Sequence, residues 1–341
     1  MATNTTTKID IFNHIFPDTF FERMLASVSD KGKVKRWLNI PFLVDLDDRF
    51  RKMDQFGDYQ QILSLSAPPI EALAGPNHSP DLARVGNDGM ADYCSRYPDR
   101  FPGFIASLPL NNPEASLAEL HRCMKDLNAV GVQLFSNVNG MPIDGPDCYP
   151  LFEAMAAYDK PIFLHPIRTS SMPDFAADKK SLYEIWWTFG WPYETSAAMA
   201  RLVFSKLFEK LPDIKIITHH MGGMIPYFEG RVGPGWDQLG SRTADEDYVS
   251  LLNSLKKRPI DYFHMFYADT AMFGSASGTR CGLDFFGVDK VVFASDAPFD
   301  PEGGTMYIRE TIKVIDELDI SEDDRRKIYN GNARDLLQLA V

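Results

Sequence analysis

Short apolar runs of strand length recur along this chain, and most are followed by a segment with amphipathic helical spacing. Eight runs predict β-strands at residues 9–15, 61–66, 101–108, 129–135, 161–165, 214–220, 265–270 and 291–295. Helices are predicted between them, including residues 113–127, 148–158, 196–210 and 305–318. Strand and helix alternating eight times is typical of one α/β fold, the (β/α)8 TIM barrel.

A doubly wound open sheet is the alternative arrangement. Such a sheet normally has a glycine-rich phosphate turn after its first strand, and this sequence has none, so the barrel is favoured. Three longer segments interrupt the alternation, at residues 20–59, 168–193 and 233–260. The first is charged and mostly helical in pattern, and we expect it to cap the barrel mouth. With no linker in the pattern, residues 1–341 are predicted to form one domain.

The amino-acid composition limits the kinds of molecule that this protein is expected to bind. The formal net charge of −12 and a pI near 5.1 argue against nucleic acid, which requires a basic face. The sequence has no apolar run long enough to span a bilayer, and its first residues lack the layout of a signal peptide. Its 4 cysteines are widely spaced, which indicates reduced thiols. We therefore expect a cytoplasmic protein without nucleic-acid or membrane partners.

Polar side chains stand at the C-terminal ends of several predicted strands, where α/β barrels place their chemistry. Side chains alternate between the two faces of a strand, which puts His14 on the inward face together with Phe12. The same count turns His165 and Asp296 inward at the ends of the fifth and eighth strands. Two imidazoles and a carboxylate that converge on one mouth predict a divalent metal site, such as zinc or manganese.

The sixth strand ends in two consecutive histidines followed by a methionine and two glycines. Counted by alternation, Ile216, Thr218 and His220 face the barrel, and His219 faces the helix layer. His220 is thus predicted to join the site, whereas His219 is predicted to be a packing residue.

At these residues a family resemblance becomes specific. The matching motifs are IDIFNHIFP (residues 9–17), LARVGND (82–88), YPDRF (97–101), GVQL (131–134), LHP (164–166), HMGG (220–223), YADT (267–270), SDAP (295–298) and GNAR (331–334). They run in order over nearly the whole chain. The sequence resembles the amidohydrolase superfamily, in the branch of aminocarboxymuconate-semialdehyde decarboxylase and the γ-resorcylate (dihydroxybenzoate) decarboxylases.

The resemblance implies roles for individual residues. His14, His165 and Asp296 would ligate a divalent metal, with zinc as the first choice and manganese, magnesium or iron as alternatives. His220 would be a catalytic histidine near the metal rather than a ligand, and Asp296 would also take part in catalysis.

Two positions in this sequence bear on the number of ligands and metals. The family pattern has a further ligand two residues before His14, usually histidine and sometimes glutamate, and here that residue is Phe12. A lysine at the end of the fourth strand would indicate a carbamylated bridge between two metals, but Gln133 stands in that run. We therefore expect one metal, with water or substrate at its open positions.

Candidate substrate-binding residues lie around the expected ligands. Trp191 and Tyr193, in the segment after the fifth strand, are predicted to stack on a planar substrate, and Phe12 to form an apolar wall. Arg168 and Arg231 are candidate clamps for a carboxylate. In relatives, the position of Arg231 can reach a neighbouring subunit's site, which implies a homodimer or higher homo-oligomer.

These features predict a metal-dependent, non-oxidative decarboxylase, a carbon–carbon lyase, acting on a small aromatic or enoic carboxylic acid. Asp296 or His220 would protonate the ring carbon before CO2 leaves. A hydrolase or hydratase that uses metal-activated water needs the same residues and stays open. A metal-free binding protein on a degenerate barrel is a third interpretation, against which the retained histidines and aspartate argue.

Overall fold

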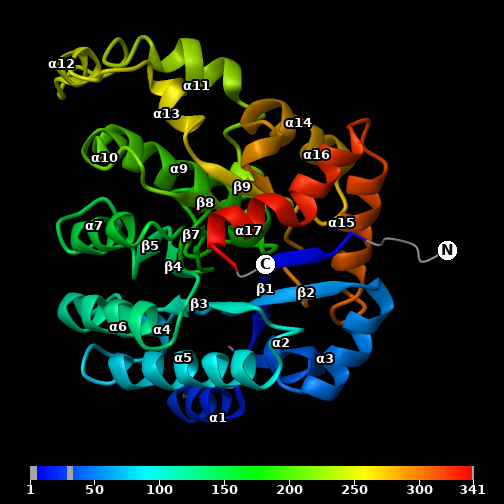
Figure 1. Ribbon diagram of the computed structural model, residues 1–341. Helices are drawn as coiled ribbons and strands as arrows, with labels where there is room; N and C mark the ends of the chain where they lie inside the picture. The colour runs from blue at the N-terminus through cyan, green and yellow to red at the C-terminus, as the bar shows by residue number, and fades with distance from the viewer. Residues whose placement is uncertain (1–5, 29–33, 340–341) are drawn as a thin grey trace.

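The computed structural model describes residues 6–28 and 34–339, in which eight parallel strands form one sheet in chain order (Figure 1). The strands are β1 (Lys8–Ile15), β2 (Tyr59–Leu65), β3 (Gly103–Ser107), β4 (Gly131–Phe135), β7 (Ile162–His165), β8 (Ile216–Thr218), β9 (Tyr267–Asp269) and β10 (Val291–Val292). The sheet closes because Ile11 N donates to Phe293 O and Asp296 N donates to Phe12 O, both at 3.0 Å. The predicted (β/α)8 barrel is confirmed, since a doubly wound sheet would reverse its strand order.

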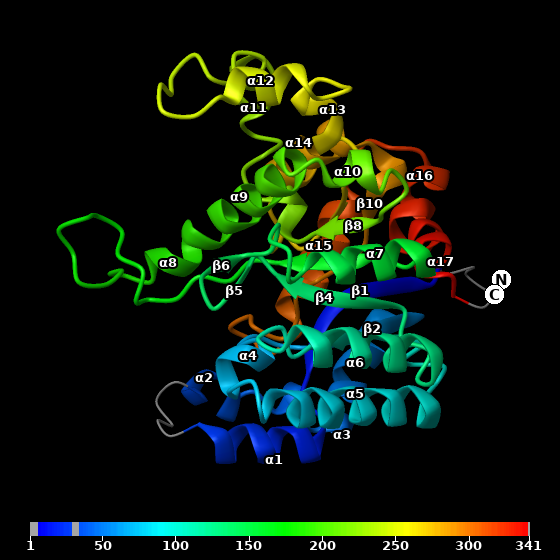
Figure 2. The ribbon, with the colours of Figure 1, turned by 90° about the vertical axis from the view of Figure 1, so that its left-hand side faces the viewer.

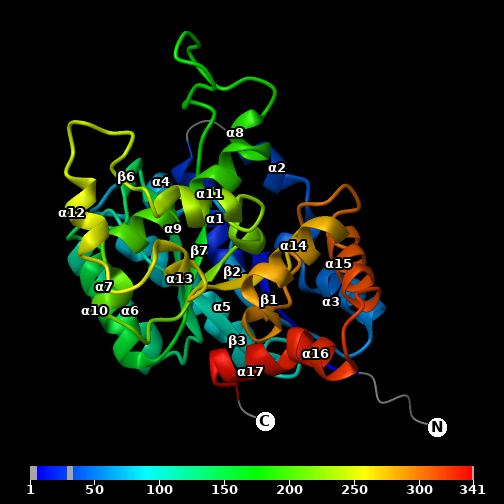
Figure 3. The same ribbon diagram turned by 90° about the horizontal axis from the view of Figure 1, so that it is seen from above.

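Helices cover the outside of the barrel between successive strands (Figures 1 and 3). The longer ones are α1 (Asp18–Ser27), α3 (Leu46–Met53), α5 (Ser79–Arg96), α6 (Pro113–Lys125), α7 (Tyr149–Tyr158), α9 (Gly190–Phe204), α11 (Glu229–Trp236), α14 (Ala276–Phe286) and α15 (Met306–Asp316). The shorter ones are α2 (Lys35–Leu38), α4 (Ile70–Leu73), α8 (Ile185–Thr188), α10 (Leu207–Lys210), α12 (Tyr248–Asn253), α13 (Pro259–Phe263), α16 (Glu322–Arg326) and α17 (Asn332–Leu337). Within the described ranges, no helix has the length and apolar character needed to cross a membrane.

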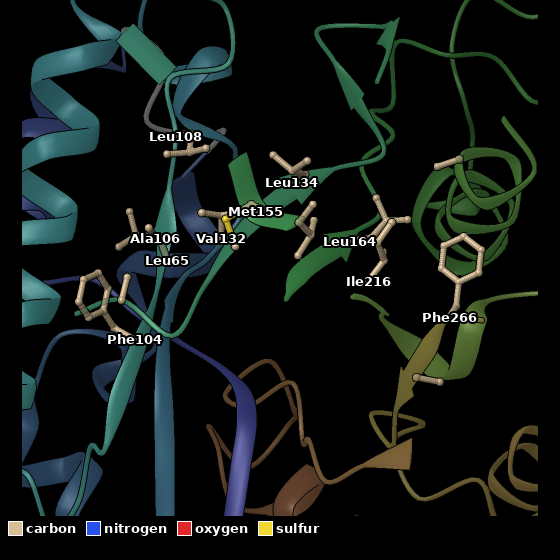
Figure 4. Packing of buried hydrophobic residues seen from close by; sticks show 14 of the residues in the cluster. Leu65, Phe104, Ala106, Leu108, Val132, Leu134, Met155, Leu164, Ile216 and Phe266 are labelled. Atoms are coloured by element: carbon tan, nitrogen blue, oxygen red, sulfur yellow. The ribbon is translucent and has the colours of Figure 1, made fainter. Parts of the chain in front are cut away.

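Strand alternation separates two apolar cores. The outer core lies between the sheet and the helices, and it includes Leu134 on β4, Leu164 on β7 and Ile216 on β8 (Figure 4). The inner core fills the barrel and includes Phe12, Ile105, Phe163, Ile217 and Val292. The barrel is therefore a packed core, and the site can form only at its C-terminal mouth.

The segment between β1 and β2 contains α1, α2 and α3. One buried arginine of this segment contacts the end of β1, next to the site. Arg49 on α3 is fully buried and donates hydrogen bonds to the carbonyl oxygens of Phe42 and His14. It also donates to the side chains of Asn13 at 3.0 Å and Gln61 at 2.6 Å. Burial lowers the pKa of Arg49 to about 9. Its contacts fix the end of β1; that these helices close the barrel mouth stays a prediction.

The segment after β7 leaves the barrel as a projecting arm, residues 168–189, which ends in α8 (Figures 2 and 3). Three large side chains of the arm are open to solvent: Phe175 is 74% exposed, Tyr183 90% and Phe189 67%. Apolar surface of this kind on an extended segment is typical of an interaction site.

Candidate metal and catalytic site

The structure brings together the three residues predicted to be metal ligands. His14 ends β1, His165 ends β7 and Asp296 follows β10, and their ligand atoms all lie within 4.8 Å of one another. All three side chains are buried, and His14 Nε2 lies 2.9 Å from Asp296 Oδ1. Strand ends separated by up to 282 residues in sequence thus meet at one point of the mouth.

The hydrogen-bond partners of these residues fit a divalent cation. His14 Nδ1 lies 3.3 Å from Ser64 Oγ, which orients the ring and directs Nε2 to the site. His165 Nδ1 is buried and has no hydrogen-bond partner among the described residues. A buried ring nitrogen normally has a partner, and two imidazoles with a carboxylate suit zinc, manganese or iron.

Electrostatics keep His165 and Asp296 in the protonation states that bind metal. Burial lowers the pKa of His165 well below its usual value, and the neighbouring His219, His14 and His220 lower it further. For Asp296, burial raises the pKa, but the hydrogen bond from His14 and the nearby imidazoles outweigh this, so that the pKa is lowered. Neutral imidazoles and an ionised carboxylate are the forms that coordinate a cation.

His219 corrects one prediction, because its side chain lies inside the barrel and not in the helix layer. Its ring centroid is 3.6 Å from that of Phe12 and 5.4 Å from that of His165. In β8 it is Ile217 that belongs to the inner core, whereas Ile216 packs outward. His219 therefore continues the inward face of β8, and its Nδ1 bonds Asp269 on β9.

His220 reaches the site by a different route. The strand ends at Thr218, and His220 and Met221 take left-handed backbone conformations with φ of 55° and 53°, so strand alternation no longer applies. The His220 ring nevertheless lies 6.1 Å from that of His165. Its Nδ1 donates to the carbonyl oxygen of Ala271 at 2.9 Å, since a carbonyl can only accept. This bond orients the ring, and a role of His220 as an acid–base group stays a prediction.

Phe12 lies below the ligands and is fully buried. Its ring centroid is 4.7 Å from that of His14 and 5.5 Å from that of His165, and it also contacts His219. The residue thus packs among imidazoles at the position where the family pattern has a further ligand. Its role as an apolar wall for substrate stays a prediction.

Trp191 and Arg168 lie beside His165 on the arm side of the mouth. The Trp191 ring centroid is 5.2 Å from that of His165, and Trp191 Nε1 donates to Arg168 O at 3.2 Å. Arg168 itself forms an ion pair with Glu194, with 3.0 Å between Nη1 and Oε1. Its guanidinium is therefore partly neutralised, and a substrate carboxylate would have to share this guanidinium with Glu194.

Tyr193 and Arg231 lie at the surface of the subunit. Tyr193, on α9, is 56% exposed, and Arg231, on α11, is also exposed. A contact of either residue with substrate stays a prediction, and for Arg231 it concerns the site of a neighbouring subunit.

Several residues of the site were not singled out from the sequence. Ser64 orients His14, Asp269 holds His219, and three aromatic rings adjoin the site histidines. These rings are Phe135 at 5.2 Å from His165, Phe273 at 5.2 Å from His220 and Phe299 at 5.4 Å from His14. Side-chain alternation along β2 places Ser64 on the inward face, and Asp269 lies near the end of the predicted seventh strand. Both residues could therefore have been found from the sequence.

Ligands at the C-terminal ends of barrel strands define a metal-dependent barrel enzyme, and comparisons with known proteins agree. The amidohydrolase family model matches residues 14–339. The chain is 34% identical over 314 residues to gamma-resorcylate decarboxylase of Polaromonas sp., covering 87% of this chain and 89% of the relative. It is 30% identical over 295 residues to 2-amino-3-carboxymuconate-6-semialdehyde decarboxylase of Dictyostelium discoideum, covering 86% and 77%. The chain belongs to the amidohydrolase family.

Solved structures show the same relationship. Dihydroxybenzoic acid decarboxylase from Polaromonas sp. JS666, with bound manganese and the inhibitor 2-nitroresorcinol, matches with a TM-score of 0.79 and 30% identity over 98% of this chain and 97% of that one. A complex of 2,6-dihydroxybenzoate decarboxylase with 2,6-dihydroxybenzoate matches with a TM-score of 0.77 and 27% identity, over 98% and 99%. The predicted resemblance to this decarboxylase branch is confirmed. A single divalent metal is supported, but the expectation of zinc is not, since the first of these structures holds manganese.

Proposed function

We propose that this enzyme is a metal-dependent, non-oxidative decarboxylase of a small aromatic carboxylic acid. The observation that carries the proposal is the convergence of the ligand atoms of His14, His165 and Asp296 within 4.8 Å at the barrel mouth. Relatives that align with most of the chain are decarboxylases, and one is bound to a dihydroxybenzoate. His220 and Trp191 beside the ligand His165 complete the site with an acid–base group and an aromatic wall.

His14, His165 and Asp296 would hold a divalent ion, which when bound would supply positive charge to orient the carboxylate of the substrate. The protein then has to place one proton on the ring carbon that bears the carboxylate. His220 can supply it as a positioned acid, whereas Asp296, which is held ionised, would first have to take up a proton from the substrate or from water. Protonation interrupts the aromatic system; the carbon–carbon bond then breaks, its electron pair returns to the ring and CO2 leaves. Orientation and a placed acid in a dry pocket are the contributions of this chain.

Zinc and manganese are the two candidates for the identity of the metal. The ligand types favour zinc or manganese on chemical grounds, and the manganese-bound relative supports manganese. We propose one divalent ion per chain at His14, His165 and Asp296. Elemental analysis of protein purified without added metal gives both the identity and the ratio.

Hydrolysis by activated water would employ the same residues. No contact in the site favours it over decarboxylation, and the relatives cited are decarboxylases. The retained ligand set also argues against a metal-free binding protein.

The proposed reaction is tested by incubating metal-analysed enzyme with a panel of hydroxybenzoates. We expect stoichiometric release of CO2 and the matching phenol, and we expect a chelator to abolish turnover. Ring opening or lactone cleavage without CO2 would overturn the assignment in favour of a hydrolase.

We also propose that the enzyme is a cytoplasmic homodimer or higher homo-oligomer. The exposed aromatic residues of the arm support self-association, because burying them against a second copy removes apolar surface from water. All 4 cysteines are free, which is in keeping with a reducing compartment.

A further inference from the structure

Gln133 on β4 is a buried amide that the fold does not use. The residue is 2% exposed, and neither its Oε1 nor its Nε2 has a hydrogen-bond partner among residues 6–28 and 34–339. Val132 and Leu134 belong to the outer core, so Gln133 points to the opposite, inner face of the sheet. Burying an amide without a partner costs free energy, and folded proteins rarely keep such a group without a function for it.

The Gln133 side chain lines a pocket at the C-terminal ends of β2, β3 and β4. Ser66 and Ser107 add polar atoms to the lining, and Leu65, Leu108 and Phe135 add apolar ones. The pocket adjoins the metal ligands, because Phe135 pairs with His165 across β4 and β7 and their ring centroids lie 5.2 Å apart. The cavity has a volume of about 10 Å³, which is room for one water-sized group such as a hydroxyl substituent of a ring held at these residues.

We propose that Gln133 is a specificity-determining residue that hydrogen-bonds a second oxygen substituent, a hydroxyl, on the ring of the aromatic acid. The inference rests on the proposed decarboxylase function and assigns to Gln133 the choice between ring substituents. A primary amide presents one acceptor and two donor hydrogens, and a phenolic hydroxyl can donate to Oε1 and accept from Nε2 together. A second carboxylate fits less well, because it only accepts and would leave Oε1 unpaired.

A second buried glutamine provides a matched control. Gln61 lies on β2, which β3 separates from β4, and is fully buried, but its partners are all protein groups. Its Oε1 accepts from Arg49 Nη1 at 2.6 Å, and its Nε2 donates to the Tyr59 hydroxyl at 3.1 Å. The same substitution at the two positions therefore separates a ligand-binding amide from a structural one.

The experiment compares wild type, Gln133→Leu and Gln61→Leu, each loaded with metal. Salicylate is the reference substrate, and the test substrates are 2,6-dihydroxybenzoate and its isomers that retain the ortho hydroxyl. We expect wild type to prefer at least one dihydroxybenzoate in kcat/KM, and Gln133→Leu to lose about 10- to 100-fold of that preference. The Tm of Gln133→Leu should equal or exceed that of wild type, because the substitution removes an unpaired amide. Gln61→Leu should lower the Tm and keep the preference.

Binding of the same acids, measured by calorimetry, distinguishes this inference from the proposed reaction. If no acid loses CO2 but binding shows a preference that depends on Gln133, the decarboxylase assignment fails and the role of Gln133 stands. If CO2 is released but Gln133→Leu keeps the wild-type preference, the role of Gln133 is overturned. It is equally overturned if Gln133→Leu is destabilised as strongly as Gln61→Leu, or if no preference is found in either turnover or binding.

Discussion

Phe12 places an apolar ring among the histidines of the site. Its centroid lies 4.7 Å from that of His14 and 5.5 Å from that of His165, so a polar side chain in its place would enter the same space as the ligands. A divalent ion held by His14, His165 and Asp296 would therefore have more of its coordination sphere open to water or substrate than one with a further histidine ligand.

We predict that Phe12→His binds a divalent ion more tightly than wild type, because the added imidazole supplies a donor where water now serves. Metal affinity is measured by competition with a chromophoric chelator, and Phe12→Leu, which stays apolar, should not show the gain. An unchanged affinity in folded Phe12→His would mean that this position does not face the ion.

The adjacent histidines His219 and His220 should separate into two roles. His220→Ala is predicted to lower turnover by roughly 10²–10⁴-fold, the scale of losing a positioned acid–base group, while metal content and Tm persist. His219→Ala removes the side-chain partner of Oδ2 of the fully buried Asp269 and should lower stability by about 1–3 kcal/mol. Both variants are assayed for metal content, Tm and turnover. Full turnover in His220→Ala with loss in a stable His219→Ala would exchange the two assignments.

At the level of single residues, the sequence was most informative where strands are regular. His14, His165 and Asp296 followed from counting alternate positions, and the structure brings them together. His219 was misplaced because the count was anchored on His220, which lies in a left-handed turn beyond the end of β8. A one-residue error in register exchanges the two faces of a strand.

Helix α4 carries a buried acid that no strand or helix pattern reveals. Glu71 is 5% exposed, and neither of its carboxylate oxygens has a partner within the described part of the chain. Burial raises its pKa from 4.5 to about 7. In the unfolded chain the group ionises near its ordinary pKa, so the folded state holds more protons between pH 4.5 and about 7, and stability falls as the pH rises through this range.

We predict that Glu71→Gln removes this pH dependence. At pH values above 7 the variant should be more stable than wild type, on the order of 1–3 kcal/mol, and near pH 4 the two should be similar. Urea unfolding across this pH range measures the difference. A constant difference at all pH values would show that Glu71 does not titrate with folding.

Across the entire barrel, the eight predicted strands were found, and errors were confined to their ends. Residues 129–135, for example, were predicted for a strand that runs over Gly131–Phe135. The spacing of apolar residues differs between strands and helices and depends only on the local sequence. The order of the elements could therefore be predicted from it. The arm could not, because its course depends on what packs against it rather than on periodicity.

We predict that the arm mediates self-association. Phe175→Ser combined with Tyr183→Ser should lower the particle mass measured by light scattering, because both side chains are largely exposed in the single chain. Val249→Ser, at a 53% exposed position on α12, is the control. A mass equal to that of wild type in the double variant would remove the arm from the interface.

Arg49 couples the segment between β1 and β2 to the proposed metal site. Its guanidinium joins α3 to the backbone carbonyl of His14, so a helix outside the barrel and a predicted metal ligand share one anchor point. Replacing this segment with the corresponding segment of another barrel would therefore also move His14, and with it change the retention of the ion that we propose there. Variants that diversify the mouth while keeping Arg49 and its four acceptors are the ones in which substrate range can change on its own.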